Sequence, residues 1–308
     1  MPQPGHFYRR VLDWDVSSVG IGTYLGAMDD ATDRAYIDAL VAAAENGINF
    51  FDTAINYRRQ RSELNIGVAL SRLRRENIED IVVCTKAGFL TPGAIPATLD
   101  PKTVVAGMHC MAPDFLSDQI DRSRENLGVD TIDVFYLHNP ETQLAEVPRP
   151  EFDRRIHAAF TRLEELVAKN KIRYYGIATW DGLRKGALPL PRLAELAGPH
   201  FRFIQLPFNL AMTEAFTGEP ESVLQAAERL GIVTVASASL LQTRILPNVP
   251  DVIPGLATPA QRAIQFTRST PGISVALVGM SKREHVLENI GVGRVPLLSR
   301  EQYRRMYP

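Results

Sequence analysis

The sequence predicts an α/β fold of the (β/α)8 or TIM-barrel class, formed by one domain over residues 1–308. Short apolar runs typical of β-strands alternate with amphipathic stretches of helical period, and this alternation occurs eight times along the chain. Most of the strand candidates are continuous apolar runs, as expected of parallel strands that are covered on both faces. The length of 308 residues slightly exceeds the ~250 typical of such a barrel, which leaves room for inserted loops.

The expected elements follow one another in strict alternation. Strands are expected at 17–23, 48–53, 81–86, 133–138, 173–178, 203–206, 233–237 and 274–279. Amphipathic helices are expected at 33–47, 62–74, 117–128, 151–171, 220–231 and 258–269. Gly47, Gly128 and Gly231 come at the ends of three of these helices, where a left-handed C-cap favours glycine.

Two connections are longer than the alternation requires. They follow the third strand, at about 87–116, and the fourth strand, at about 139–150. Because loops that follow barrel strands lie over the carboxyl-terminal mouth, where barrel enzymes carry out their chemistry, we expect both loops to form substrate walls.

Composition limits the partners and the location of the chain. The 34 basic and 35 acidic residues give a formal charge of −1, so no net field attracts nucleic acid or an anionic membrane. No apolar segment approaches the ~20 residues of a membrane span, and the opening MPQPGHFYRR lacks the apolar core of a signal peptide. Cys84 and Cys110 lack metal-ligand spacing, and Cys84 lies in an apolar run that favours a buried thiol. We expect a cytoplasmic protein with a small-molecule partner.

The segment GIGTYLG near the start of the chain resembles a dinucleotide-binding fingerprint. Gly20, Gly22 and Gly26 are spaced G-x-G-x-x-x-G, which is one residue too long. No acidic residue ends a second strand at the expected offset, so the spacing argues against a doubly wound fold.

Three of the predicted strands end in ionisable side chains. Asp52, Lys86 and His138 end the second, third and fourth strands, and Tyr57 follows Asp52 by five residues. All four are expected to face the same mouth. A phenol titrates near ~10, so a neighbouring cation is needed to make it a ready proton donor. Lys86 can be that cation if Asp52 keeps it protonated, and His138 can hold the substrate oxygen; no metal is needed.

The chain resembles the aldo-keto reductase family in three places. These are FDTAINYRRQRSELNIGVAL, a strand that ends in TK, and a strand that ends in YLHNPE. The likeness extends from VGIGTYLG to VLENI and implies a barrel that binds an extended nicotinamide dinucleotide and reduces carbonyl groups reversibly. By this resemblance, Asp52, Tyr57, Lys86 and His138 match the catalytic tetrad, with Tyr57 as the general acid.

The resemblance also implies a set of cofactor contacts. They are Gly22, Thr23, Thr179, Gln205, Ser237, Gly279, Ser281, Lys282, Arg283, His285, Glu288 and Asn289. The turn formed by Ser281, Lys282 and Arg283 favours NADP(H), through its 2'-phosphate, over NAD(H) as the alternative. The pattern departs from the family at Ala178, at His285 and at Ser237, which stands where many members have a stacking aromatic ring. Trp180 and Phe208 are the candidates to replace that ring, and the alternative is that the stacking contact is absent.

Loop residues suggest the substrate. Tyr24, Phe89, Met111 and Trp180 are expected to line an apolar cavity suited to aldehydes or ketones with hydrophobic bodies.

Two other functions compete with carbonyl reduction. One is a catalytically silent barrel that binds a nicotinamide cofactor as a sensor or regulator; the altered positions 178 and 237 favour it and the intact tetrad opposes it. The other is a lyase in which Lys86 forms a Schiff base with Tyr57 as proton relay. Asp52 argues against the lyase because a paired lysine stays protonated.

Overall fold

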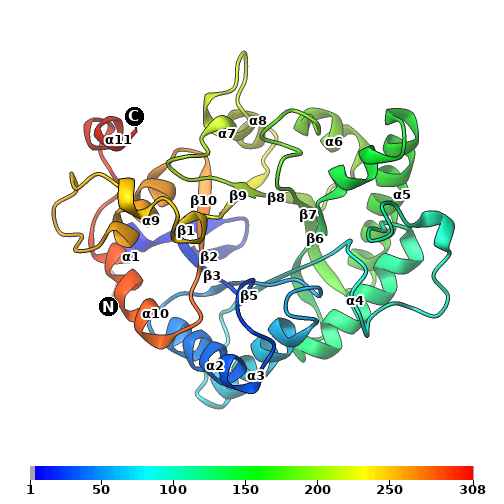
Figure 1. Cartoon of the computed structure of the whole chain (residues 1–308), viewed down its shortest axis with the longest axis horizontal. Coiled ribbons are helices and arrows are strands. Elements are labelled where there is room, and N and C mark those ends of the chain that lie inside the picture. Colours follow the sequence, from blue (N-terminus) through cyan, green and yellow to red (C-terminus); the bar gives the residue numbers. More distant parts are fainter. Residues whose placement is uncertain (1–3, 308) are drawn as a thin grey trace.

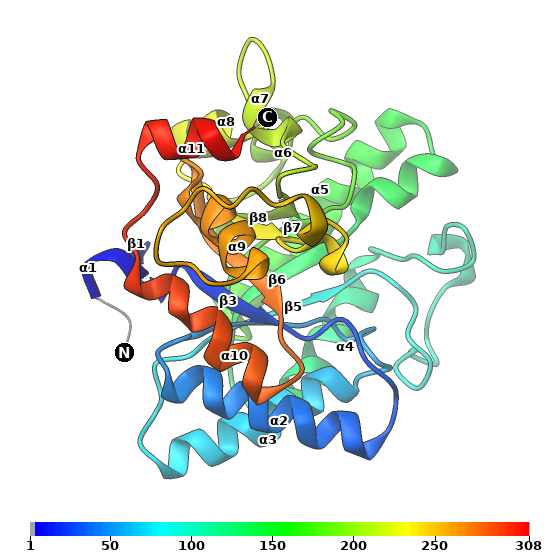
Figure 2. The same ribbon diagram turned by 60° about the vertical axis from the view of Figure 1, so that its left-hand side comes forward.

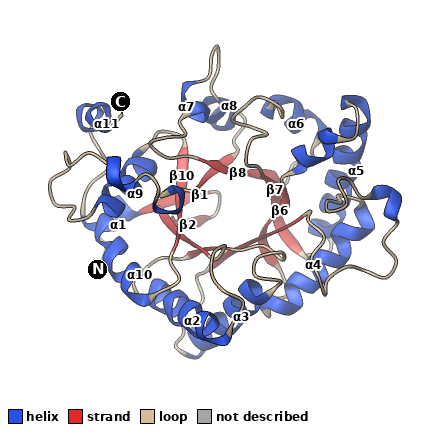
Figure 3. Cartoon of the chain, viewed as in Figure 1, coloured by secondary structure: helices blue, strands red, loops and turns tan. Residues whose placement is uncertain are grey.

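A closed ring of eight parallel strands forms the centre of the computed structural model, which describes residues 4–307 (Figures 1 and 3). The strands are β3 (Val19–Gly22), β4 (Phe50–Asp52), β5 (Val82–Ala87), β6 (Ile132–His138), β7 (Ile172–Ala178), β8 (Phe201–Pro207), β9 (Val233–Ser237) and β10 (Ile273–Gly279). Each pairs with the next, and β10 closes the ring on β3. The predicted (β/α)8 fold and all eight predicted strands are confirmed.

Helices surround the ring (Figure 3). They are α2 (Asp30–Glu45), α3 (Arg61–Arg75), α4 (Pro113–Leu127), α5 (Arg149–Ala168), α6 (Leu190–Leu196), α8 (Val223–Arg229), α9 (Pro259–Ser269) and α10 (Arg283–Asn289). Shorter helices outside this alternation are α1 (Pro4–Phe7), α7 (Glu214–Thr217) and α11 (Arg300–Met306). The six predicted helices are present, and Gly47, Gly128 and Gly231 have the positive φ expected of them (91°, 62° and 66°).

Helix boundaries differ from the prediction where capping residues decide them. The helix expected at 220–231 starts only at Val223, because the Ser222 side chain caps it and Gln225 completes a capping box. The sequence analysis did not include α6, whose seven residues are too few for a clear helical period and which begins directly after Pro189.

A hairpin that the sequence analysis did not predict covers the amino-terminal end of the barrel. Its strands are β1 (Tyr8–Val11) and β2 (Trp14–Ser17), paired antiparallel. The Trp14 ring lies 5.4 Å from Tyr174 and 6.3 Å from Phe203, near the starts of β7 and β8. Because the hairpin closes this end, access to the barrel interior is left to the carboxyl-terminal end.

Three long connections lie over that open end. The two predicted loops correspond to residues 88–112, which contain the short helix η1 (Pro101–Thr103), and 139–148, which contain η2 (Pro140–Ala145). The third, residues 238–258, follows β9 and contains η3 (Leu241–Thr243) and η4 (Leu246–Asn248). Only the first two are predicted in the sequence analysis, although the elements expected at 233–237 and 258–269 also leave a long connection between them.

The outer surface carries no membrane-spanning element within residues 4–307, since no helix there is long and apolar enough to cross a bilayer. Cys84 and Cys110 are both free thiols and both buried, as predicted for Cys84.

Figure 2 shows α10 beside α2 on the outside of the barrel. The Arg283 guanidinium on α10 lies 3.6 Å from the Glu45 carboxylate of α2.

Candidate active site

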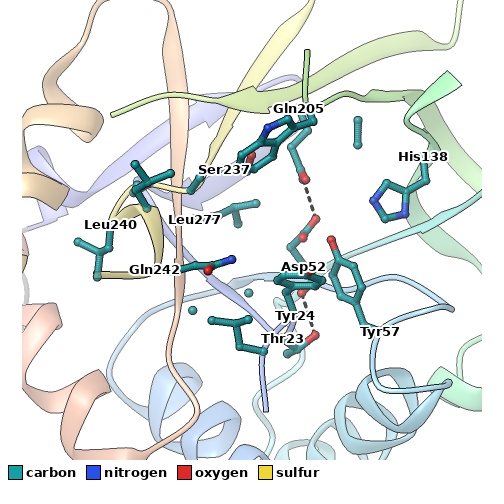
Figure 4. Close-up of a pocket in the computed structure, with 18 of the residues that line it drawn as sticks. Thr23, Tyr24, Asp52, Tyr57, His138, Gln205, Ser237, Leu240, Gln242 and Leu277 are labelled. Atoms are coloured by element: carbon teal, nitrogen blue, oxygen red, sulfur yellow. Dashed lines mark hydrogen bonds between the residues drawn. The ribbon is translucent and has the colours of Figure 1, made fainter. Parts of the chain in front are cut away.

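A cavity of about 780 Å³ opens among the carboxyl ends of the strands. Figure 4 shows Tyr57 and His138 on one side of this cavity, with Ser237, Leu240 and Leu277 on the other. The predicted strand-end residues therefore do meet at one mouth, as the parallel arrangement of the strands requires.

A buried ion pair lies at the base of the cavity. The fully buried Lys86 Nζ donates hydrogen bonds to Asp52 Oδ1 at 2.6 Å and to the Thr53 carbonyl oxygen at 2.7 Å. Gln205 Nε2, from β8, donates to the other carboxylate oxygen of Asp52 at 2.8 Å. Burial alone would lower the pKa of Lys86, but the attraction of Asp52 outweighs it, so the pKa is raised and the ammonium persists at neutral pH.

The Tyr57 ring lies against this ammonium. Lys86 Nζ is 5.0 Å from the ring centroid, within the range of a cation–π contact. Burial raises the pKa of the Tyr57 phenol, and the Lys86 charge opposes that rise without cancelling it. The expectation that Lys86 makes the phenol more acidic than usual is therefore wrong for the protein by itself, because desolvation is the larger effect. The phenol stays protonated at neutral pH.

A strained turn sets the position of Tyr57 between β4 and α3. The three residues after it, Arg58, Arg59 and Gln60, all have positive φ (49°, 53° and 72°). Arg58 anchors the turn, because its Nη2 lies 2.6 Å from Asp33 Oδ1 and its Nε donates to the Ala27 carbonyl oxygen at 2.9 Å. The strain is thus held by the buried guanidinium of the residue that follows Tyr57.

His138 completes the group. Its ring centroid lies 5.7 Å from that of Tyr57, with the two planes at 76°, and 5.1 Å from the Phe89 ring. Burial lowers the pKa of His138 well below its usual value, and the charge of Lys86 lowers it further. The imidazole is therefore neutral, and its buried Nδ1 has no hydrogen-bond partner among residues 4–307.

Of the predicted cofactor contacts, six line the cavity. They are Gly22, Thr23, Thr179, Gln205, Ser237 and Gly279. The other six lie outside it, in the turn after β10 or on α10: Ser281, Lys282, Arg283, His285, Glu288 and Asn289. Helix α10 packs against α2 on the outside of the barrel (Figure 2).

The predicted substrate residues divide in a similar way. Tyr24, Phe89 and Trp180 line the cavity, but Met111 does not. Met111 is buried in the apolar core and lines a separate cavity of about 290 Å³ beside α5. Its loop folds back onto that helix because burying the apolar thioether there is favourable. Phe208 is also unavailable for stacking, since it is fully buried against Phe266.

Several lining residues escaped the sequence analysis. They are Leu25, Asn56, Asn139, Leu277 and the run 238–243. The run 238–243 follows directly after a predicted strand, which was the available signal. Four of its residues have positive φ, namely Ala238, Leu241, Gln242 and Thr243 (55°, 45°, 52° and 68°), so its path could not be inferred from apolar periodicity.

Glu141 is a further residue that the sequence analysis did not assign a function. Its Oε1, on η2, accepts hydrogen bonds from the backbone N–H groups of Trp180, Asp181 and Gly182 at 3.0, 3.2 and 3.1 Å. This carboxylate ties the loop after β7, which carries Trp180, to the connection after β6.

The fold and this site define a parallel barrel with a cluster of ionisable side chains at its carboxyl mouth. A sequence model of the Aldo/keto reductase family matches residues 18–249, so the chain belongs to this family and is an oxidoreductase.

Individual proteins of known sequence or structure resemble this chain at low sequence identity. A putative voltage-gated potassium channel subunit beta from Schizosaccharomyces pombe is 26% identical, over 89% of this chain and 84% of its own length. An NADH-specific methylglyoxal reductase from Escherichia coli is 30% identical, over 55% of this chain and 50% of its own. The fold is shared with an aldo/keto reductase from Klebsiella pneumoniae crystallised with NADP and acetate. That structure has a TM-score of 0.70 at 20% identity and covers 95% of this chain and 90% of its own.

Proposed function

We propose that this chain is an NADP(H)-dependent reductase that converts aldehydes or ketones to alcohols, with Tyr57 as the general acid. The observation that carries the proposal is the buried Asp52–Lys86 pair beneath a protonated phenol, with a neutral imidazole facing that phenol. The name of the methylglyoxal reductase from Escherichia coli and the NADP-bound state of the Klebsiella enzyme support the same reaction class.

The cavity fits a nicotinamide cofactor. Its volume of about 780 Å³ lies within the ~300–1,000 Å³ range of small-molecule and cofactor sites. Leu240 and Leu277 offer apolar walls, and Thr179 and Gln205 offer polar groups. The Ser239 hydroxyl on the wall is buried and has no partner among residues 4–307, as expected of a group that pairs with a ligand.

The chain's own residues supply acid chemistry and orientation. A bound reduced nicotinamide supplies the hydride that the carbonyl carbon accepts. The Tyr57 hydroxyl then donates its proton to the carbonyl oxygen, and the Lys86 ammonium stabilises the phenolate that remains. Asp52 keeps Lys86 charged throughout. Neutral His138, whose ring faces that of Tyr57, orients the substrate carbonyl.

The lining favours an uncharged substrate. Tyr24, Phe89 and Trp180 give the mouth an aromatic character, and neither lysine nor arginine lines the cavity in the described part of the chain. The carboxylate of Asp52 is already paired with Lys86 and Gln205. A substrate that carries a carboxylate or phosphate would have to be desolvated without a compensating charge, which is unfavourable.

Replacement of the proton donor tests the mechanism. We expect Tyr57→Phe to lower kcat by at least ~10²-fold, as is typical of losing a general acid, while NADPH affinity stays nearly unchanged. The measurement follows the absorbance of NADPH with a panel of aldehydes, and the Kd comes from fluorescence titration. Tyr24→Phe is the matched control, because Tyr24 also lines the cavity, with its ring 4.9 Å from that of Tyr57. Retention of activity in Tyr57→Phe would exclude Tyr57 as the donor.

The preference for NADP(H) rests on the exposed turn after β10. Lys282 and Arg283 are exposed cations there, and Arg283 is paired only at 3.6 Å with Glu45. We expect the double replacement of Lys282 and Arg283 by Ala to weaken NADPH binding far more than NADH binding. Replacing Arg304 and Arg305 of α11 by Ala removes two exposed cations elsewhere and serves as the control. Equal weakening of both cofactors would mean that this turn does not distinguish the 2'-phosphate.

A silent nicotinamide-binding regulator is the second candidate. The likeness to a protein named as a channel subunit and the departures at Ala178 and Ser237 favour it. Tight NADPH binding without turnover of any carbonyl in the panel would support the regulator over the reductase. The lyase has less support, since a fully buried, ion-paired Lys86 stays protonated and is a poor nucleophile.

A further inference from the structure

A buried chain of polar side chains lies behind His138, on the side away from the cavity. Arg155 Nη1, on α5, donates to Gln143 Oε1 at 2.7 Å. Gln143 Nε2 lies 2.9 Å from His109 Nδ1, and His109 Nε2 lies 2.8 Å from the backbone carbonyl oxygen of His138. Gln143 and His109 are only 0% and 1% exposed, so water does not compete for these bonds.

The chemistry of the groups gives this chain a direction. Arginine can only donate, so the Gln143 carbonyl oxygen faces Arg155 and the Gln143 amide group faces His109. His109 Nδ1 must then accept, and the proton of the neutral ring is on Nε2. Burial lowers the pKa of His109 to about 4, which keeps the ring neutral. His109 is therefore a fixed donor to the His138 carbonyl oxygen.

The surrounding backbone leaves room for this contact. A Cβ atom on Gly88 would lie 2.6 Å from the His138 carbonyl oxygen and 2.8 Å from His109 Nε2. Any other residue at position 88 would push the two groups apart. The Phe89 ring packs edge-on against both histidine rings, at 5.2 Å from His109 and 5.1 Å from His138.

The peptide that follows His138 is held from a second direction. Asn139 has a left-handed conformation (φ 49°), and its N–H donates to the Ala178 carbonyl oxygen at 2.7 Å. With its carbonyl oxygen bonded to His109, the His138–Asn139 peptide plane has little freedom to rotate. The backbone from which the His138 side chain projects is therefore held in place.

We propose that His109, supported by Gln143, is a positioning residue that sets the angle of the His138 ring toward Tyr57 and the substrate carbonyl. This inference rests on the proposed reductase function, because a fixed His138 ring matters only if His138 orients the substrate carbonyl. His138 acts as an uncharged partner, so its contribution depends on alignment rather than on long-range attraction.

Two variants at position 109 test the inference. His109→Leu removes the donor while keeping an apolar side chain there, and His109→Gln keeps an Nε2–H group for the His138 carbonyl oxygen. With saturating NADPH, we expect kcat in His109→Leu to fall by about tenfold or more, within the ~10²-fold that a displacement of ~1 Å can cause. NADPH affinity should be unchanged, and His109→Gln should recover most of kcat.

A second measurement separates positioning from stability. The sequence has six histidines, so ¹⁵N-labelled histidine gives a readable set of imidazole signals. His109→Leu should shift the His138 signals. Gln265→Leu is the matched control, since Gln265 is fully buried and donates to the Pro296 carbonyl oxygen at 2.7 Å, away from the cavity. It should lower stability without moving the His138 signals or kcat.

The outcomes distinguish the two proposals. Wild-type kcat in His109→Leu, or a loss no larger than in Gln265→Leu with unshifted His138 signals, would overturn the positioning inference. If the wild-type protein reduces no carbonyl but His109→Leu still shifts the His138 signals, the reductase proposal fails and the positioning of His138 stands. If His109→Leu does not fold, Gln143→Leu removes the support of His109 and is judged by the same two measurements.

Discussion

Burial and neighbouring charges together set the protonation states of the ionisable side chains at the mouth of the barrel. Lys86 remains charged because Asp52 compensates for its loss of hydration. Tyr57 keeps its proton, because desolvation raises the pKa of its phenol by more than the Lys86 charge lowers it, and His138 stays neutral, because desolvation and the Lys86 charge both lower the pKa of its imidazole. At neutral pH the site thus holds a charged ammonium, a protonated phenol and a neutral imidazole.

The buried His109 makes stability depend on pH. Its pKa falls from 6.5 to about 4 on folding, so the unfolded chain binds more protons between these values. Stability from this group is present above about pH 6.5 and is lost as the pH falls through about 4, with a limit of about 3 kcal/mol. We expect the free energy of unfolding of His109→Gln to fall less between about pH 7 and pH 4 than that of the wild type.

Urea unfolding at each pH measures that difference. His138, whose pKa is also lowered, is present in both proteins and contributes equally to each. Parallel pH profiles for the two proteins would contradict the assignment of the effect to His109.

At the scale of elements, the connections after β6 and β7 act as one unit. Glu141 of η2 accepts three backbone N–H groups of the loop that carries Trp180. Burial raises the pKa of Glu141, and these hydrogen bonds oppose the rise. The position of Trp180 in the wall of the cavity thus depends on Glu141, which lies in the connection after the neighbouring strand β6.

Removal of this link should loosen Trp180. The sequence has two tryptophans, so Trp14→Phe leaves Trp180 as the single emitting residue. In that background we expect Glu141→Ala to increase acrylamide quenching of Trp180 and to weaken ligand binding by several-fold, because three backbone donors lose a charged acceptor at a cost of about 1–3 kcal/mol. Glu141→Gln, which keeps an oxygen acceptor, should lie closer to wild type.

Glu146→Ala is the control for this prediction. Glu146 lies at the end of the same connection but accepts from the N–H of Ala106 at 2.7 Å, in a different loop. Equal quenching in the Glu141 and Glu146 variants would indicate that Glu141 does not hold Trp180.

At the scale of the whole molecule, one buried arginine joins distant parts of the chain. Arg268 of α9 donates to Ser18 Oγ at 3.0 Å, just before β3, and to the Val292 carbonyl oxygen at 3.2 Å, beyond α10. It also donates to the His6 carbonyl oxygen, near the start of the described chain. These bonds fasten both terminal segments to the barrel at the point where β10 closes on β3.

We expect Arg268→Met to lower the free energy of unfolding by about 3 kcal/mol or more, because several buried acceptors lose their donor. Urea unfolding measures the loss, and the exposed Arg304→Met on α11 provides a control that should change it little. NADPH affinity at 25 °C should persist in the folded Arg268→Met protein. A variant as stable as wild type would show that Arg268 does not join these segments energetically.

Much of this architecture follows from local patterns. Continuous apolar runs predict eight strands because parallel strands are covered on both faces, and the alternation with amphipathic helices predicts how they connect. Strand ends then predict that Asp52, Lys86 and His138 share a mouth; Asp52 and His138 line its cavity, and Lys86 is buried beneath it against Asp52. The sequence by itself therefore determined the barrel and the gathering of these strand-end residues at one end of it.

Only the tertiary structure decided which loop residues reach that mouth and how the ionisable groups titrate. Met111 turns into the core beside α5 while 238–243 turn toward the cavity, and neither path has a periodic signal. Burial raises the pKa of the Tyr57 phenol, although the nearby Lys86 charge predicts a lower pKa. His109 supports His138 although the two residues are 29 positions apart in the sequence. Desolvation and contacts between distant residues depend on how completely the folded chain excludes water, and that is set by packing rather than by the order of residues in any one segment.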